Sequence, residues 1–349
     1  MPQFTIVVPL MDQVDAFEST LASVLRYKEQ GLQIIVAHSG AYEDIHGILD
    51  EVQSVVIPQR SGTSVLSIVA QASNELAKSP WVSWLAPGIE ATEGWFEGMH
   101  ESLAMPAEFG LLSPRVFAGE DLQDVQAELG CLASCITHSR SFHPVYLEEV
   151  VGEQWDIDDI AQLGQAVGPT SWAGFCRRQL LQQWSELPIS RRLSNGYAEL
   201  SLGLFLKQEG WSHEISNSWV SANPEAQQAI ESPFRRCGKS ASLVMANYES
   251  GSVISKVIRS IGYAAAEIAS GIVSPSQIGV GFGRLGSLSL LSQKAKRRSP
   301  ILVEDLDAFD QDVEGHEDSI TRFQVIGQQD SRKPSTRRSS TGRKSGYAA

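Results

Sequence analysis

Three short apolar runs near the start of the chain decide the fold: Phe4-Thr-Ile-Val-Val8, Leu32-Gln-Ile-Ile-Val-Ala37 and Trp81-Val-Ser-Trp-Leu85. Each run is rich in β-branched or aromatic residues without regular polar alternation, which is typical of strands buried on both faces. Between the runs, apolar residues recur at helical spacing over Val14–Leu25 and again over Thr63–Lys78. Strands and helices that alternate in this way form a parallel sheet through right-handed crossovers. The sequence therefore predicts an α/β fold with a mostly parallel central sheet flanked by helices.

Weaker signals extend this pattern along the chain. They predict a further strand at Ser54-Val-Val-Ile57 and helices over 45–52, 92–103 and 197–210. Ligands of parallel sheets bind beyond the carboxyl ends of the strands. The loops Pro9–Gln13, His38–Glu43 and Ala86–Thr92 are therefore the places where a site is expected.

The character of the chain changes twice after the α/β pattern ends. We predict an α/β domain over residues 1–225, a helical extension over 226–303 and a disordered tail over 304–349. Residues 304–318 hold eight acids and no Lys or Arg, whereas residues 331–349 hold six basic residues and no acid. Blocks of like charge usually stay solvated, which is why we expect the tail to be disordered.

Composition excludes several classes of protein. The chain has 349 residues, 42% of them hydrophobic, and 28 Lys and Arg against 41 Asp and Glu give a net charge of −13. A body this acidic is not expected to bind nucleic acid nonspecifically. The 4 cysteines are too few to staple the chain, which favours a reducing compartment and a cytoplasmic location. The sequence predicts no targeting or membrane-spanning segment, and at most peripheral contact with a membrane.

The order of these motifs resembles glycosyltransferase family 2, whose members have the GT-A fold and transfer sugars from nucleotide-sugar donors with inversion. The resemblance covers roughly residues 3–215. The matching segments are Ile6-Val-Val-Pro9, Ile34-Ile-Val-Ala-His-Ser-Gly40, Trp81-Val-Ser-Trp-Leu85, Gly94-Trp95, Trp172-Ala-Gly-Phe-Cys-Arg-Arg178 and Gly196–Trp211. It implies a GT-A-like sheet, a nucleotide-sugar donor substrate, and a glycan or a lipid-linked molecule as acceptor.

This chain departs from the family at the polar residues that carry the chemistry. The family's Asp-x-Asp pair, which holds a divalent ion at the leaving diphosphate, falls on Ala86-Pro87-Gly88, whose side chains offer no oxygen ligand. Glu90 is the one carboxylate close by, and one carboxylate is too few for Mg²⁺ or Mn²⁺. This departure from the family implies no metal ligands and no cofactor here. The resemblance places the nucleotide-binding positions at Pro9, Asp12, His38, Gly40 and Gln71.

The family's catalytic base, the Asp of a Glu-Asp pair, falls on Glu199, and the acid before it falls on Ala198. A carboxylate at Glu199 would accept the proton of the acceptor hydroxyl. Two interpretations stay open. The protein is either a transferase that works without a metal, or a GT-A-like binding or scaffolding protein that has lost catalysis. In the first case, we expect Arg177, Arg178, Arg191 or Arg192 to stabilise the leaving diphosphate.

Other patterns have both a functional and a structural interpretation. The spacing Cys131-x3-Cys135-x2-His138-x4-His143 fits zinc poorly and favours buried cysteines and loop histidines. The sequence Gly281-Phe-Gly283-Arg-Leu-Gly286 matches the dinucleotide-binding pattern, but a turn between helices is favoured because no strands follow to complete a sheet. The acids at 156, 158 and 159 are interpreted as a solvated turn. The basic tail is interpreted as a solubilising segment in preference to one that touches a membrane or nucleic acid.

Overall fold

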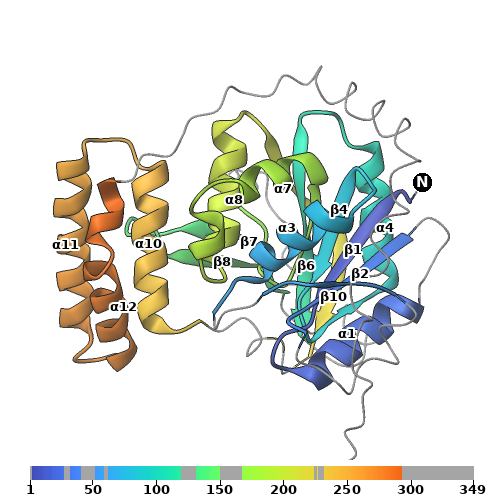
Figure 1. Cartoon of the computed structure of the whole chain (residues 1–349), viewed down its shortest axis with the longest axis horizontal. Helices are drawn as coiled ribbons and strands as arrows, with labels where there is room; N and C mark the ends of the chain where they lie inside the picture. The colour runs from blue at the N-terminus through green and yellow to red at the C-terminus, as the bar shows by residue number, and fades with distance from the viewer. Residues whose placement is uncertain are drawn as a thin grey trace, which may run out of the picture. The chain divides into compact units, whose positions relative to one another are not determined.

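The computed structural model describes residues 2–26, 32–40, 52–58, 62–118, 131–149, 167–223, 226 and 232–292 (Figure 1). The predicted helix over 45–52 falls almost entirely outside these ranges, and so do the three aspartates at 156–159 and the whole predicted tail. Residues 1–301 form one compact unit. None of the helices in the described ranges combines the length and the apolarity needed to cross a bilayer.

The N-terminal half of the sheet is the predicted parallel arrangement. Strands β1 (Phe4–Pro9), β2 (Leu32–His38), β3 (Gln53–Val56) and β4 (Trp81–Leu85) lie in the order β3-β2-β1-β4, and all three pairings are parallel. Helix α1 (Val14–Arg26) follows β1, and α3 (Val65–Leu76) follows β3. Every residue of β1 and β4 is buried, as a continuous apolar run requires. The prediction of a parallel sheet built from these runs is confirmed.

The second half of the sheet is mixed, because both antiparallel and parallel pairings occur beyond β4. Strand β9 (Ala173–Arg177) pairs antiparallel with β4 and with β6 (Phe109–Ala118), and β10 (Ser212–Ala222) runs parallel to β6. Strand β5 (Ile89–Ala91) closes the order β3-β2-β1-β4-β9-β6-β10-β5, and the hairpin of β7 (Cys131–His138) and β8 (Pro144–Glu149) extends from β6. Gly174 lies opposite Trp84, and a Cβ there would come within 2.4 Å of the Trp84 ring. Glycine at this position therefore makes room for the Trp84 ring.

Helices α4 (Glu93–Ala104), α7 (Arg178–Ser185) and α8 (Tyr197–Gln208) and the 3-10 helix η1 (Ser190–Arg192) complete this part of the chain. Residues Thr92 and Ser64 cap α4 and α3, because their hydroxyls accept from the N–H groups of Trp95 and Ser67. The predicted helices at 92–103 and 197–210 are thereby confirmed within two residues at each end.

Three helices follow the sheet: α10 (Phe234–Tyr248), α11 (Val253–Ser270) and α12 (Pro275–Leu285), with a short 3-10 helix, η2 (Leu288–Ser292), after them. Figure 1 shows them as a group beside the β7–β8 hairpin. The pattern Gly281-Phe-Gly283-Arg-Leu-Gly286 lies in the last turns of α12 and its C-cap, so it is neither a strand-to-helix loop nor a turn. Its glycines instead let helices approach closely: a Cβ on Gly283 would come within 1.9 Å of the Arg235 carbonyl oxygen, and one on Gly281 within 2.8 Å of the Ala264 oxygen.

Candidate functional site at the carboxyl edge of the sheet

The carboxyl ends of β1 and β2 bring Pro9 and His38 to one edge of the sheet. Both residues are buried, and the adjoining backbone is tied together because the N–H of Leu10 donates to the carbonyl oxygen of Ala37. The Nδ1 atom of His38 accepts a hydrogen bond of 3.2 Å from the N–H of Gly40, which has φ +86°. The imidazole of His38 thus holds the loop that follows β2 in a left-handed turn that favours glycine.

The other two predicted nucleotide contacts, Asp12 and Gln71, are placed differently. Asp12 is exposed in the loop after β1. Gln71 is half-buried on α3, and its side-chain amide donates to the carbonyl oxygen of Ser67 one turn earlier on the same helix. Pro9, His38 and Gly40 therefore share the edge of the sheet, whereas Gln71 is engaged by its own helix. All five remain predicted nucleotide contacts.

The loop after β4 does not fit a divalent metal. Ala86 is fully buried and its N–H donates to the carbonyl oxygen of Trp172. Gly88 has φ +84°, and a Cβ there would come within 2.6 Å of Asn223 Oδ1 and 2.9 Å of the Ala226 backbone. The space that a second carboxylate would need is filled. Among the described residues, no group of three His, Cys, Asp or Glu side chains is placed to hold a metal ion.

The nearby acid, Glu90, is hydrogen-bonded to helix α1. Its Oε1 atom accepts a hydrogen bond from the hydroxyl of Ser19 on α1. Two further hydroxyls of α1 hold the same loop, because Thr20 Oγ1 accepts from the N–H of Gly88 and Ser23 Oγ accepts from the N–H of Ala91. The loop is therefore held against α1 by three side-chain hydrogen bonds, one of which involves Glu90.

Glu199 lies in the first turn of α8 and is completely buried. No described group reaches either of its carboxylate oxygens at ordinary hydrogen-bond geometry. Burial raises the pKa of Glu199 to about 7, although nearby backbone N–H groups of Glu199, Gly196 and Leu66 and the Ser171 hydroxyl oppose the rise. Leu66 belongs to the first turn of α3, so the carboxylate lies close to the N-terminal ends of two helices.

The neighbours of Glu199 form a buried polar cluster. Ser171 Oγ accepts a hydrogen bond of 2.9 Å from the N–H of Gly196, which has φ +78°. The pKa of Tyr146 is raised well above its usual range, mainly by burial and also by the charge of Glu199. The sequence analysis missed Tyr146 and Ser171. Tyr146 lies in β8 and Ser171 just before β9, and no local sequence pattern indicates that these two residues are close in space.

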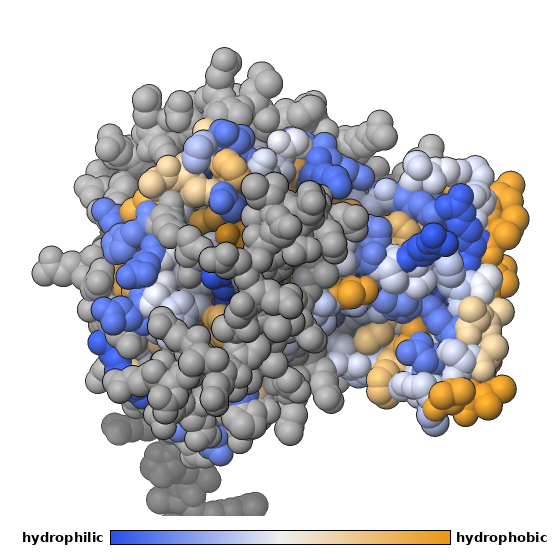
Figure 2. All heavy atoms as spheres, turned by 180° about the vertical axis from the view of Figure 1, so that it is seen from behind, coloured by the Kyte–Doolittle hydropathy of each residue, from blue (hydrophilic) through white to orange (hydrophobic). Residues whose placement is uncertain are grey.

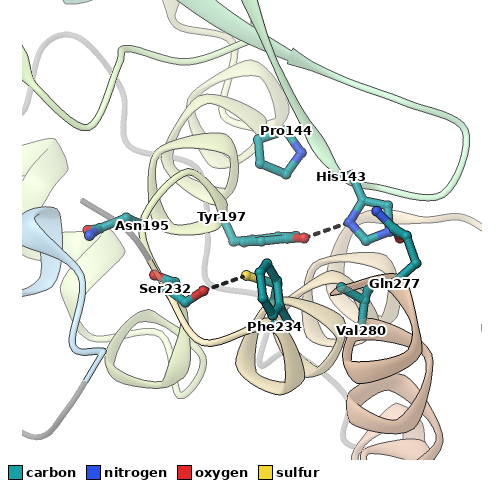
Figure 3. Close-up of a pocket in the computed structure, with 9 residues that line it drawn as sticks. His143, Pro144, Asn195, Tyr197, Ser232, Phe234, Gln277 and Val280 are labelled. Carbon is teal, nitrogen blue, oxygen red and sulfur yellow. Dashed lines mark hydrogen bonds between the residues drawn. The ribbon is translucent and has the colours of Figure 1, made fainter. Parts of the chain in front are cut away.

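A cavity of about 420 Å³ lies between the β7–β8 turn, the start of α8, and helices α10 and α12. His143, Asn195, Tyr197, Cys237 and Gln277 are among its lining residues (Figure 3). The hydroxyl of Tyr197 and Nδ1 of His143 are hydrogen-bonded at 2.6 Å across it. A cavity of this volume suits a small ligand, and Tyr197 precedes Glu199 by two residues. Glu199 itself does not line the cavity.

His143 also belongs to a charged network. Its Nε2 atom lies 2.8 Å from Glu267 Oε1, and Glu267 in turn accepts hydrogen bonds from the fully buried Arg284. Burial alone would raise the pKa of Glu267, but hydrogen bonds from His143 and Arg284 outweigh it and lower the pKa below its ordinary value. His138 stacks on Phe142, so both histidines of the Cys/His pattern have partners within the protein.

The predicted cations separate into two groups. Arg177 pairs with Trp81 at the amino end of β4, and Arg178 donates to the carbonyl oxygen of Ala77. Because β9 is antiparallel to β4, both lie at the edge opposite Ala86, roughly 13 Å along a five-residue strand. They cannot reach a diphosphate at the carboxyl edge, and the expectation for these two was wrong.

Arg191 and Arg192 are exposed in η1, beside the start of α3, since Ser67 donates to the carbonyl oxygen of Ser190. Arg236 of α10 was missed by sequence reasoning. Its side chain lies against Gly62 just before α3: a Cβ on Gly62 would come within 2.9 Å of Arg236 Cδ. The Arg236 side chain and the backbone of η1, which carries Arg191 and Arg192, therefore lie near the N-terminal end of α3, and a helix N-terminus is suited to anions.

Comparison with known proteins gives a structural likeness only. No family model matches the sequence, and no curated protein matches it. Among solved structures, GalNAc-T7 with UDP, GalNAc and Mn²⁺ superposes with a TM-score of 0.54 at 11% identity, covering 90% of this chain. This chain spans 54% of the length of that one.

Another match is the mannosyltransferase PcManGT from Pyrobaculum calidifontis in complex with GDP-Man and Mn²⁺. It has a TM-score of 0.43 at 11% identity and covers 90% of this chain and 81% of its own. Identities this low establish the fold alone, and the likeness to GalNAc-T7 is the one on which that assignment rests. The strand order, the crossover helices and the superposition on GalNAc-T7 agree, and the chain has a GT-A-like fold.

Proposed function

We propose that this protein is a family-2-like glycosyltransferase that takes a sugar from a nucleotide-sugar donor and transfers it with inversion. The observation that carries the proposal is Glu199: a buried carboxyl group at the position of the family's base, with a pKa of about 7. A general base is most effective when its pKa lies near the operating pH. Strongly shifted pKa values cluster at functional sites.

The reaction would follow from the groups around the carboxyl edge. Glu199 would take the proton of the acceptor hydroxyl as its oxygen forms a bond to the sugar carbon. The bond from that carbon to the diphosphate would break on the opposite face, and its electron pair would leave with the nucleoside diphosphate. Arg191, Arg192 and Arg236, near the N-terminal end of α3, are the proposed partners of the negative charge that develops.

We propose that donor binding does not require a divalent cation. Ala86 and Gly88 bring no ligand oxygen, the space beside Gly88 is filled by Asn223 and Ala226, and Glu90 is bonded to Ser19. Calorimetric titration with UDP- and GDP-sugars, in Mn²⁺ and in EDTA, tests this directly. We expect equal affinity in both buffers, and an affinity that appears only with Mn²⁺ would contradict the proposal.

The catalytic role of Glu199 is tested with Glu199→Gln, which keeps the volume of the side chain and removes its basicity. We expect transfer to fall by about a hundred- to ten-thousand-fold while donor affinity is unchanged. Glu186→Gln, an exposed acid at the end of α7, is the matched control and should keep full activity. Full activity in Glu199→Gln would show that Glu199 is not the general base.

One observation favours a second candidate, a catalytically silent GT-A-like binding or scaffolding protein. Glu199 is completely buried and does not line the described cavity, so an acceptor must displace part of the protein to reach it. Failure to bind any nucleotide-sugar in the titration above would select this second function. Binding without turnover would select it as well.

We also propose a reducing, cytoplasmic setting. Among the described residues, Cys176 and Cys237 form no disulfide bond. Burial raises the pKa of Cys176 to about 12, so this thiol stays protonated and unreactive.

A further inference from the structure

Helix α11 turns an apolar stripe away from the rest of the protein. Ile254, Ile258 and Ile261 follow at helical spacing and are 72%, 64% and 44% exposed. The face that α11 buries instead carries Ser260, Ala264 and Glu267. This is the reverse of the usual arrangement, in which a surface helix buries its long aliphatic side chains. Figure 2 shows hydrophobic residues along the outer edge of this helical region.

The stripe continues around the end of the helix. Ile272 and Val273, in the turn between α11 and α12, are 91% and 90% exposed. Ile278 of α12 reaches the end of α11, because a Cβ on Gly271 would come within 2.1 Å of Ile278 Cγ1. Single exposed aliphatic residues are ordinary, but a row of them along a helix and its turn marks an interaction surface.

Charge distinguishes the kinds of partner this surface fits. Residues 232–292 hold 6 Lys and Arg against 2 acids, whereas residues 1–231 hold 11 Lys and Arg against 30 acids. Both acids of the helical region, Glu249 and Glu267, are already in ion pairs with Arg259 and Arg284. The apolar stripe therefore lies on the basic part of an otherwise acidic protein.

A partner must accommodate apolar side chains and an excess of positive charge at once. A second copy that presented the same stripe would bring two basic regions together, and like charges would oppose the contact. An anionic lipid surface satisfies both features, because aliphatic side chains enter the boundary between headgroups and acyl chains while Lys and Arg remain at the headgroups. The acidic α/β part would be repelled by the same surface, which orients the molecule.

We propose that α11 and the α11–α12 turn dock peripherally on an anionic lipid bilayer. Ile254, Ile258, Ile261, Ile272 and Val273 enter the interface, and the exposed basic residues of α10 and α11 contact the anionic headgroups. None of the described helices crosses a bilayer, so the contact is confined to one face of the membrane. This inference does not depend on catalysis.

The test is flotation of the full chain with vesicles of phosphatidylcholine alone or mixed with phosphatidylglycerol. We expect flotation with the mixed vesicles, little with the neutral ones, and release at high salt, because exposed charges are screened. Ile258→Asp combined with Ile272→Asp should weaken binding at least about tenfold, since both aliphatic groups leave the interface. Val56→Asp, an exposed valine of β3 that is 58% accessible, is the matched control and should bind like the wild type.

A second experiment adds one fluorescent tryptophan to the exposed turn between α11 and α12. Ile272→Trp should be quenched by brominated acyl chains in mixed vesicles, beyond the quenching of the native tryptophans. Equal flotation with neutral vesicles, or no flotation at all, would overturn the proposal. So would a dimer in sedimentation that is lost in the double Asp variant, because the stripe would then belong to a second copy.

Discussion

Glu199 shows at the scale of one residue how burial changes the chemistry of an acid. Its pKa is about 7 in the folded protein, against an ordinary value of 4.5. Between these two values the folded state binds more protons than the unfolded state. The free energy of unfolding therefore falls as the pH rises from about 4.5 to about 7, and the contribution of the protonated acid is lost above that range.

Glu199→Gln removes this titration and should flatten the corresponding part of the stability curve. Between about pH 5 and about pH 8, we expect the wild type to lose up to about 3 kcal/mol relative to the variant. Urea unfolding at the two pH values measures the difference. Glu186→Gln should keep the wild-type dependence on pH. If Glu199→Gln keeps it too, Glu199 does not change its protonation state over this range.

Two glycines with the same backbone angle separate strain from crowding. Gly88 and Gly210 both have φ +84°, but a Cβ on Gly88 meets Asn223 and Ala226, whereas one on Gly210 meets nothing within 4 Å. Gly210→Ala should cost about 1–2 kcal/mol, from the left-handed backbone alone. Gly88→Ala should cost about 1–3 kcal/mol more, because the neighbouring backbone must move. Chemical denaturation of both variants gives the comparison, and equal losses would mean that the loop after β4 has room for a side chain.

At the scale of the element, α12 shows why a motif must be judged by its surroundings. Its glycines satisfy the spacing of a dinucleotide-binding loop, yet they lie inside a helix where α10 and α11 approach its backbone. Spacing alone does not distinguish the two uses of glycine. The strand that should precede a phosphate-binding loop would have distinguished them, and the described residues place no strand there.

Alanine substitutions test this packing role. Gly283→Ala should destabilise the protein by about 1–3 kcal/mol, because its Cβ would come within 1.9 Å of the carbonyl oxygen of Arg235. Gly262→Ala, on α11 with nothing within 4 Å of its Cβ, should stabilise it by about 0.5–1 kcal/mol, since alanine favours a helix. Thermal unfolding compares the pair. A stabilising Gly283→Ala would exclude close helix packing at this glycine.

At the scale of the whole molecule, Arg284 links the helical extension to the sheet. It is fully buried, donates to Glu267 of α11, and also donates to the carbonyl oxygen of Ser141 in the β7–β8 turn. His143 of the same turn contacts both Glu267 and Arg284. These charges connect elements more than a hundred residues apart in the chain.

Arg284→Met should destabilise the protein by about 3–5 kcal/mol, because it leaves Glu267 charged and largely buried without its main partner. The control is Arg259→Met, which breaks the ion pair with Glu249. Arg259 is 51% exposed, and its loss should cost no more than about 1 kcal/mol. Urea unfolding separates the two. Similar losses would mean that the Arg284 network is not needed to hold the extension.

The sequence predicted those parts of the fold that depend on local pattern. Apolar runs placed β1, β2 and β4, and helical spacing placed α1, α3, α4 and α8, because each element buries its own apolar face. Strands β6, β7, β8 and β10 escaped prediction, since their pairing depends on partners far along the chain. Gly174, for example, is unremarkable in the sequence and acquires its meaning opposite Trp84.

The same division holds for the candidate site. The sequence by itself determined that Ala86 and Gly88 bring no side-chain oxygen to a metal, because that is a property of side-chain chemistry. Only the tertiary structure decided that Arg177 lies at the wrong edge of the sheet, that Arg236 lies beside the start of α3, and that Glu199 is removed from water. Strand direction, contact between distant helices and burial arise when the chain packs, and no local pattern encodes them.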